Sequence, residues 1–324
     1  MTKDIPTPAA APIIVGVDGS EGSFTAVRYG AREAVRAGCE LHLVHVAPSY
    51  LPVAGLVPSA GTVSLKEFEG IGRTILKEAA VAAYEVLPRA RVRTILRLGY
   101  RVPEVLDAAR GGRLLVVGDD RTPVVARLIV GRFIGVLAAK SQIPVVSVPA
   151  DWKQPDDTAG HRVILALKDP QRIPTDLLRA GFQAAADHDA ALEITHVWNM
   201  PAGYGALVTS MMDDPSWQSI IERSVRRLAA PLRAEFPDVS YTTTSKYGQA
   251  AHILCEAGRG ADLLLLSRRA HGFPLGHFGA TGRALLRAAT CPVEVLPVAE
   301  RSAESTMPTH RAPTDEPAHA LTQH

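Results

Sequence analysis

Cysteine is scarce in this sequence, with three residues among 324, and charge of one sign is lacking, with a formal net charge of +2. Cys39, Cys255 and Cys291 show neither metal-ligand nor C-x-x-C spacing, so we interpret them as the reduced thiols of a cytosolic protein. The basic residues are scattered, which argues against a nucleic-acid partner. No apolar run approaches the length of a membrane span, and the N-terminus lacks the apolar core of a signal peptide. We therefore expect a cytoplasmic protein without a membrane partner.

The composition and length indicate a globular protein of two domains. Apolar residues make up 47% of the chain and charged residues 21%, which is enough to build substantial hydrophobic cores. A chain of 324 residues fits two domains of ordinary size.

An internal repeat defines these two domains. IIVGVDGS at 13–20 is matched by VILALKDP at 163–170, and GRFIGVLAAKSQIPVVSVP at 131–149 by GATGRALLRAATCPVEVLP at 279–297. The distance in sequence between matching segments stays at about 150 residues along the chain. The repeat predicts a first copy at 1–150 and a second copy at 161–299. Between them lies a polar linker at 151–160, and a polar, Pro-rich segment at 300–324 predicts a disordered tail.

Each copy alternates strand and helix patterns. In the first copy, short aliphatic runs lie at 13–17, 40–46, 91–98, 114–117 and 144–148. Runs that are apolar at every position are typical of parallel strands buried on both faces, and the pattern at 64–87 is that of an amphipathic helix. We therefore predict an α/β fold with two tandem, doubly wound, five-stranded parallel sheets.

The positions just beyond the strands form the candidate binding site. Ligands of open parallel sheets bind beyond the carboxyl ends of the strands. In the first copy, Asp18-Gly19-Ser20 follows the first strand, while Gly118 and, further on, Gly131 follow the fourth. Glycine at a strand-to-helix turn allows close approach to a phosphate, and the free N–H groups of a helix start favour an anion.

On these residues, the chain resembles a tandem universal stress protein over both copies. The repeat spacing, the His-Val pair in each second strand and the ending CPVEVLP carry the resemblance. It implies a Rossmann-like fold that binds ATP, with Mg²⁺ accompanying the nucleotide. The implied motif is G-2x-G-9x-G-[S/T] after the fourth strand, with an acidic residue after the first strand and a valine ending the second. It also implies pairing of the last strands across a pseudo-twofold axis, with antiparallel pairing left open, and a homodimer.

Carried over to the first copy, the motif is partly kept. Asp18 takes the acidic position and Val46 the valine position, while Gly118 and Gly131 take those of the first and third glycines. Arg121 replaces the second glycine and Arg132 the Ser/Thr residue. A side chain at position 121 disfavours close backbone approach to phosphate, yet two arginines could instead bind phosphate through charge-assisted hydrogen bonds.

In the second copy, the motif is more degenerate. Lys168 takes the acidic position, Val197 is kept, and Ser267 replaces the first glycine. Gly279 aligns with the third glycine at a spacing one residue short, and Ala280 takes the Ser/Thr position.

Simpler interpretations of these residues stay open. Asp18 could cap a helix or hold a turn, and the glycines could be structural. His45 and His196 are more typical of core histidines than of catalytic groups, and Arg268-Arg269 of a solvated surface.

We predict an ATP-binding module of the stress response with an unidentified signalling partner and no catalytic residue. A scaffold without nucleotide and a slow ATPase are the alternatives.

Overall fold

The computed structural model describes residues 11–49, 64–119, 133–155, 160–170, 172–200, 203, 215–268 and 279–297, of which 215–218 and 220 are described by their backbone. The predicted tail at 300–324 and part of the linker lie outside these residues.

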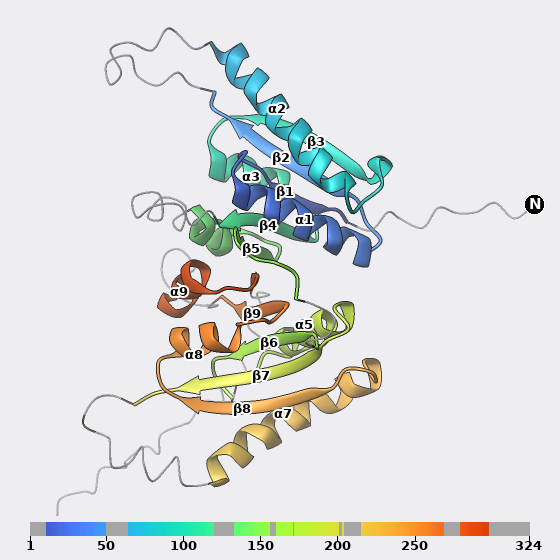
Figure 1. The fold of residues 1–324 in the computed structure, drawn as a ribbon. Helices are drawn as coiled ribbons and strands as arrows, with labels where there is room; N and C mark the ends of the chain where they lie inside the picture. The colour runs from blue at the N-terminus through green and yellow to red at the C-terminus, as the bar shows by residue number, and fades with distance from the viewer. Residues whose placement is uncertain are drawn as a thin grey trace, which may run out of the picture.

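Strands and helices alternate in both copies (Figure 1). The first copy contains β1 (Ile13–Gly16), α1 (Glu21–Arg36), β2 (Leu41–Ala47), α2 (Leu65–Tyr84), β3 (Val92–Leu98), α3 (Arg101–Ala108), β4 (Leu114–Asp119), a helical stretch at 133–140 and β5 (Val145–Pro149). The second contains β6 (Arg162–Leu167), α5 (Thr175–Asp187), β7 (Ala191–Trp198), α7 (Pro215–Glu235), β8 (Tyr241–Tyr247), α8 (Ala250–Ala257), β9 (Leu263–Ser267), α9 (Ala280–Ala288) and β10 (Val293–Leu296).

The two predicted five-stranded sheets are joined into one. The strand order is β3-β2-β1-β4-β5-β10-β9-β6-β7-β8, and neighbouring strands within each copy are parallel. The last strands β5 and β10 pair antiparallel, with Val293 opposite Ser147 and Glu294 opposite Val146. The predicted fold class is therefore confirmed, and so is the antiparallel pairing of the last strands. The continuous sheet ends at β3 on one side and at β8 on the other.

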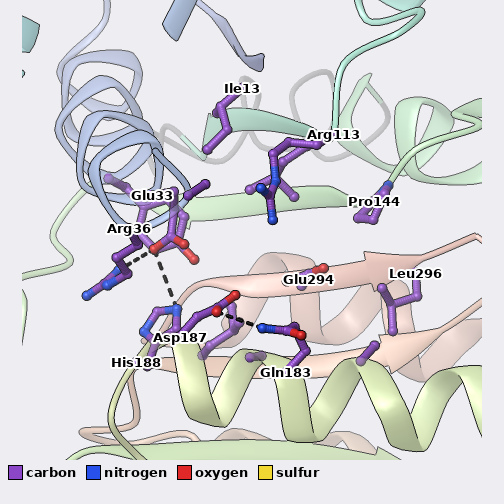
Figure 2. A pocket seen from close by; sticks show the side chains of 16 residues that line it. Ile13, Glu33, Arg36, Arg113, Pro144, Gln183, Asp187, His188, Glu294 and Leu296 are labelled. Carbon is purple, nitrogen blue, oxygen red and sulfur yellow. Dashed lines mark hydrogen bonds and ion pairs between the residues drawn. The ribbon is translucent and has the colours of Figure 1, made fainter. Parts of the chain in front are cut away.

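The two faces of the sheet differ at the junction of the copies. On one face, α3, the 133–140 helix, α8 and α9 cover a single core that contains residues of both copies, among them Leu115, Val145, Leu264 and Val293. On the other face, α1 and α2 cover a core of the first copy, while α5 and α7 cover a separate core of the second. Between α1 and α5 lie charged side chains (Figure 2). The junction is thus apolar on one face and charged on the other.

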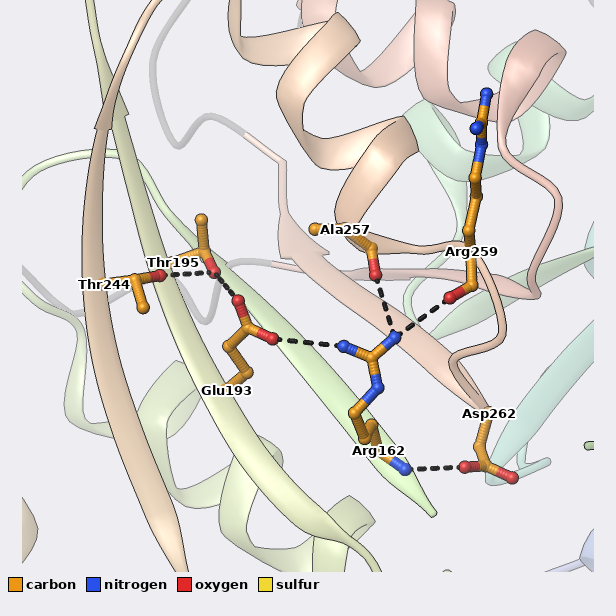
Figure 3. Close-up of polar contacts among 7 residues, drawn as sticks. All are labelled: Arg162, Glu193, Thr195, Thr244, Ala257, Arg259 and Asp262. Atoms are coloured by element: carbon orange, nitrogen blue, oxygen red, sulfur yellow. Dashed lines mark hydrogen bonds and ion pairs between the residues drawn. The ribbon is translucent and has the colours of Figure 1, made fainter. Parts of the chain in front are cut away.

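Arg162, the first residue of β6, ties this strand to its surroundings (Figure 3). Its backbone N–H donates to the Asp262 carboxylate at 2.8 Å, and one guanidinium nitrogen donates to the backbone carbonyl of Arg259 at 2.9 Å. That carbonyl lies just beyond the end of α8, where the helix dipole favours a cation. The guanidinium also contacts Glu193 of β7 at 3.4 Å, so one side chain links two strands and a helix end.

We expect Arg162→Met to lower the unfolding free energy by about 1–2 kcal/mol. The variant keeps the backbone N–H and most of the apolar stem, but it removes the guanidinium donors. Arg259→Met is the matched control. Its side chain pairs with the exposed Glu256, and its carbonyl stays in place, so the expected loss is under about 0.5 kcal/mol. Urea titration of both variants measures the difference, and equal losses would contradict the role given to Arg162.

Candidate functional site

The carboxyl ends of β1, β2 and β4 lie side by side in the first copy. Gly16 at the end of β1 is in register with Val44 of β2 and with Val117 of β4. Asp18, two residues further on, therefore lies beyond the sheet between the ends of these two strands. Of the predicted site residues, the structure brings Asp18, Val46 and Gly118 to one edge of the sheet.

The turn from β1 into α1 fixes the Asp18 carboxylate. Gly19 has φ +86, a left-handed conformation that glycine adopts at low cost. Asp18 Oδ1 accepts hydrogen bonds from the Ser20 backbone N–H at 3.1 Å and from the Ser20 hydroxyl at 2.6 Å. Ser20 in turn caps α1 by accepting from the Ser23 backbone N–H. Asp18 therefore holds the turn, as the simpler interpretation predicted, and its exposed side chain also faces solvent.

Gly118 is required by packing against the first turn of α1. A Cβ atom at this position would lie 2.2 Å from the carbonyl oxygen of Gly22 and 2.6 Å from the backbone nitrogen of Ser23. Both contacts are far shorter than van der Waals distance, and both are to backbone. Gly118 therefore lets the start of α1 approach the end of β4. A phosphate contact by Gly118 stays a prediction.

A histidine links the ends of the first two strands in each copy, β1 and β2 in the first and β6 and β7 in the second. His45 Nδ1 lies 2.8 Å from the carbonyl oxygen of Val17, and His196 Nδ1 lies 3.0 Å from that of Leu167. With a carbonyl as acceptor, Nδ1 is the protonated nitrogen. Both rings are buried, which fits the expected role as core histidines. Val46, next to His45, is also buried in the core, so a ligand would meet mainly its backbone.

The comparisons with known proteins agree with this architecture. The sequence pattern of the universal stress protein family matches residues 11–149 and again residues 161–297. The chain belongs to the universal stress protein family. It is 24% identical over 287 residues to a universal stress protein of Mycobacterium tuberculosis, covering 87% of this chain and 96% of the relative. A universal stress protein of Mycolicibacterium smegmatis is 26% identical over 295 residues, covering 88% and 96%.

A solved structure of this family supports the tandem fold. The universal stress protein from Archaeoglobus fulgidus DSM 4304 matches with a TM-score of 0.63 at 15% identity, covering 90% of this chain and 98% of that chain. At this level of identity the likeness concerns the fold.

Half of the predicted nucleotide site in the first universal stress domain lies outside the described residues. Arg121, Gly131 and Arg132 all belong to that part of the chain. Their contact with a nucleotide therefore stays a prediction.

In the second universal stress domain, the structure describes all five corresponding residues. Lys168 is exposed beyond β6, Val197 is half-buried, and Ser267 ends β9. Gly279 precedes α9 as its N-cap, and Ala280 is the exposed first residue of that helix. Whether any of them contacts a ligand stays a prediction.

Arg268 differs from its sequence-based interpretation. We interpreted the Arg268-Arg269 pair as a solvated surface, but Arg268 is half-buried and its guanidinium donates to the carbonyl of Ala139 in the first domain. That interpretation is wrong for Arg268, because its neighbour across the junction belongs to the other copy, which a single-domain pattern does not reveal. Arg269 lies outside the described residues.

A second group of polar residues was missed by the sequence analysis. Glu33, Arg113, Asp187, His188 and Glu294 line a cavity between the two domains (Figure 2). Glu294, a carboxylate within the otherwise apolar strand β10, is the signal in the sequence that could have indicated it.

Within the part of the chain that the structure describes, no group of three His, Cys, Asp or Glu side chains is arranged to hold a metal ion. None of the described helices is both long and apolar enough to cross a membrane.

Proposed function

We propose that the protein is an ATP-binding module of the stress response whose nucleotide site lies in the first domain, at the carboxyl ends of β1, β2 and β4. Mg²⁺ would accompany the nucleotide. The family membership supports a binding role, and the motif residues support this position. No residue is assigned a catalytic role.

The observation that carries the proposal is the fixed geometry around Asp18. Two hydrogen bonds from Ser20 hold Oδ1, while Oδ2 accepts none from the described residues. The carboxylate is therefore oriented before any ligand arrives, which lowers the entropic cost of binding. Gly118 brings the N-terminal turn of α1 to the same edge, where the helix dipole favours an anion.

A scaffold role for the second domain is favoured by a different observation. Arg268, next to the position of the first motif glycine, is engaged with Ala139 of the first domain. The lysine at position 168 also removes the acidic group. In this proposal the second domain supports the first and binds no nucleotide.

Asp18→Ala and Lys168→Ala form a matched pair for testing this asymmetry, because both residues follow the first strand of their copy. We expect calorimetry on nucleotide-stripped protein to give one ATP per chain with micromolar affinity, about −8 kcal/mol. Asp18→Ala should weaken binding by about tenfold or more through loss of a charged acceptor, and Lys168→Ala should leave it unchanged. The titrations are done with and without Mg²⁺.

No heat and no thermal shift at millimolar ATP would overturn nucleotide binding and leave the scaffold. Steady phosphate release that Asp18→Ala abolishes would instead support a slow ATPase. The proposal places the protein in the cytoplasm as a homodimer that acts on a signalling partner, and sedimentation of the full chain tests the dimer.

A further inference from the structure

A cavity of about 200 Å³ lies between the two domains on the charged face of the junction (Figure 2). Glu294 and Leu296 of β10 form part of its floor, and α1 and α5 form its walls. Arg113, Gln183 and Asp187, which also line it, are exposed, so the cavity is open to solvent on this side. A small molecule can therefore enter while the two domains stay in place.

The cavity exists because α5 carries smaller side chains than α1. Gly30 of α1 and Gly181 of α5 occupy equivalent positions, since each packs against the first two strands of its own copy. This equivalence aligns two pairs of residues that line the cavity, namely Tyr29 with Ala180 and Glu33 with Ala184. In a symmetric junction, a second tyrosine and a second glutamate would fill this space. The alanines of α5 instead leave room for another molecule.

Glu294 brings a carboxyl group without a partner into this cavity. It lies opposite Val146 in the antiparallel β5–β10 pair, and its neighbours Val293 and Val295 belong to the apolar core on the opposite face. Alternation along the strand therefore turns Glu294 toward the cavity, where it is half-buried. Its carboxyl group makes no hydrogen bond or ion pair with the described residues. A cation that enters the cavity would stabilise this partly desolvated acid.

Arg113, which precedes β4, supplies an opposite charge to the same cavity. Its side chain extends from the first domain toward β10 (Figure 2). Its guanidinium group makes no hydrogen bond or ion pair with the described residues. Arg113 and Glu294 both line the cavity, yet no ion pair joins them, so space is left between the two groups. A ligand that carries both a carboxylate and an ammonium group would pair with both of them.

The other charged groups of the cavity leave one negative charge without compensation. Glu33 pairs with Arg36, and Nε2 of His188 lies 3.5 Å from the same carboxylate. Burial and the charge of Arg36 lower the pKa of His188 to about 4, so its imidazole is neutral at pH 7. Asp187 has no cationic partner among the described residues. When Glu294 is ionised, two carboxylates therefore face a single arginine, and a ligand with one net positive charge would balance them.

We infer that this cavity binds a basic amino acid such as lysine, with the ligand carboxylate on Arg113 and its two ammonium groups beside Glu294 and Asp187. Such a ligand carries both kinds of charge and is positive by one unit. A cavity of about 200 Å³ has the volume of about six or seven water molecules, which suits a ligand of about ten non-hydrogen atoms. The aliphatic chain of the ligand would lie against Leu296 and the alanines of α5.

This site is separate from the proposed nucleotide site. Ile13 begins β1, Arg113 precedes β4 and Pro144 precedes β5, so the cavity lies at the amino ends of these strands. The nucleotide site is proposed at the carboxyl ends. The inference therefore does not rest on nucleotide binding.

The pH dependence of binding follows from the proton on Glu294. Burial, followed by the charges of Glu33 and Asp187, raises the pKa of Glu294 to about 8, and the charge of Arg113 opposes this shift. Without a ligand, the carboxyl group therefore holds a proton at neutral pH, and a ligand ammonium group replaces that proton. Because the proton is lost more easily as the pH rises, lysine should bind about tenfold or more tightly at pH 8.5 than at pH 6.5. The other ionisable residues that line the cavity are Tyr29, Arg36 and His188.

Calorimetric titration of the nucleotide-stripped full chain tests this site with three ligands. Lysine should bind with a Kd below about 1 mM at pH 8.5. Glutamate has as many non-hydrogen atoms as lysine but the opposite net charge, and it should give no binding heat at about 10 mM. Cadaverine keeps both ammonium groups of lysine but lacks the carboxylate, so it separates the two halves of the site.

Two substitutions act on opposite ends of the ligand. Arg113→Gln should weaken lysine binding about tenfold or more and leave cadaverine binding no weaker, because only lysine has a carboxylate. Glu294→Gln should weaken the binding of both ligands about tenfold or more and remove the pH dependence. Arg110→Gln and Glu78→Gln are the matched controls. They remove exposed charges outside the cavity and should bind lysine as wild type does.

Ala184→Leu keeps the inference testable if Glu294→Gln fails to fold. It adds volume inside the cavity without changing the charge, so it should abolish lysine binding. Urea unfolding of each variant verifies that it is folded. The inference would be overturned by the absence of lysine binding at about 10 mM, by equal binding of lysine and glutamate, or by lysine binding that survives Ala184→Leu. Equal losses of lysine and cadaverine binding in Arg113→Gln would also overturn it.

Discussion

Gly118→Ala is expected to destabilise the first domain by about 3 kcal/mol, although it adds a single methyl group. The added Cβ would overlap backbone atoms of Gly22 and Ser23, which cannot rotate away as a flexible side chain could. Relief of the clash requires α1 to move away from the end of β4. We therefore also expect ATP binding to be lost, because this movement separates the Asp18 turn from the fourth strand. Urea unfolding and calorimetry on the same preparation measure the two effects.

Gly70→Ala is the control for this substitution. Gly70 lies in α2, and a Cβ there would meet no atom within 4 Å. Alanine in a helix is favoured over glycine by up to about 1 kcal/mol, so this variant should be as stable as wild type or slightly more stable. If Gly118→Ala proved equally harmless, the close packing of α1 on β4 would be wrong.

Phe182→Ala is expected to have the largest effect, a loss of about 4 kcal/mol in the second domain. Phe182 of α5 is fully buried and packs against Phe236 and Tyr241, with ring centroids 6.1 Å and 5.5 Å away. It belongs to the core of the second domain that is separate from the first. Truncation leaves a cavity between α5 and the sheet, and neither element can move far enough to fill it.

Tryptophan fluorescence can assign this loss to one domain. Trp198 packs edge-on against Tyr247 in the second domain, and Trp152, just beyond the first domain, packs edge-on against Tyr29 of that domain. In single-tryptophan backgrounds, Phe182→Ala should shift the urea midpoint reported by Trp198 more than that reported by Trp152. Phe182→Leu keeps most of the volume and should cost less than about 1.5 kcal/mol. Equal shifts at both reporters would mean that the domains unfold as one unit.

The strands and the duplication could be predicted from the sequence because they depend on local patterns. The predicted strand at 13–17 is observed as β1 (Ile13–Gly16), and that at 144–148 as β5 (Val145–Pro149). Runs of β-branched residues fully buried on both faces leave little ambiguity. The positions of Asp18, Val46 and Gly118 at one edge follow from the same rule, because parallel strands end together.

The features of the junction could not be predicted in the same way, because they depend on which residues of one copy meet which residues of the other. The sequence around Arg268 is typical of a solvated surface, and its contact with Ala139 depends on the other copy. Glu294 and Asp187 come together with Glu33 through the register of β5 and β10, and register depends on pairing across about 150 residues of chain. The close contact between Gly118 and Gly22 could not be predicted either, because the sequence does not distinguish a glycine that contacts phosphate from one that packs against a helix.

The antiparallel β5–β10 pair joins halves that a peptide linker already holds together, so their association is unimolecular. It should survive dilution that would dissociate two separate chains of the same affinity. In a symmetric homodimer every substitution at the interface appears twice, once on each side. Here each half can change alone: a lysine at 168 need not be matched at 18, and the carboxyl group of Glu294 faces valine at the paired position 146 of the other half.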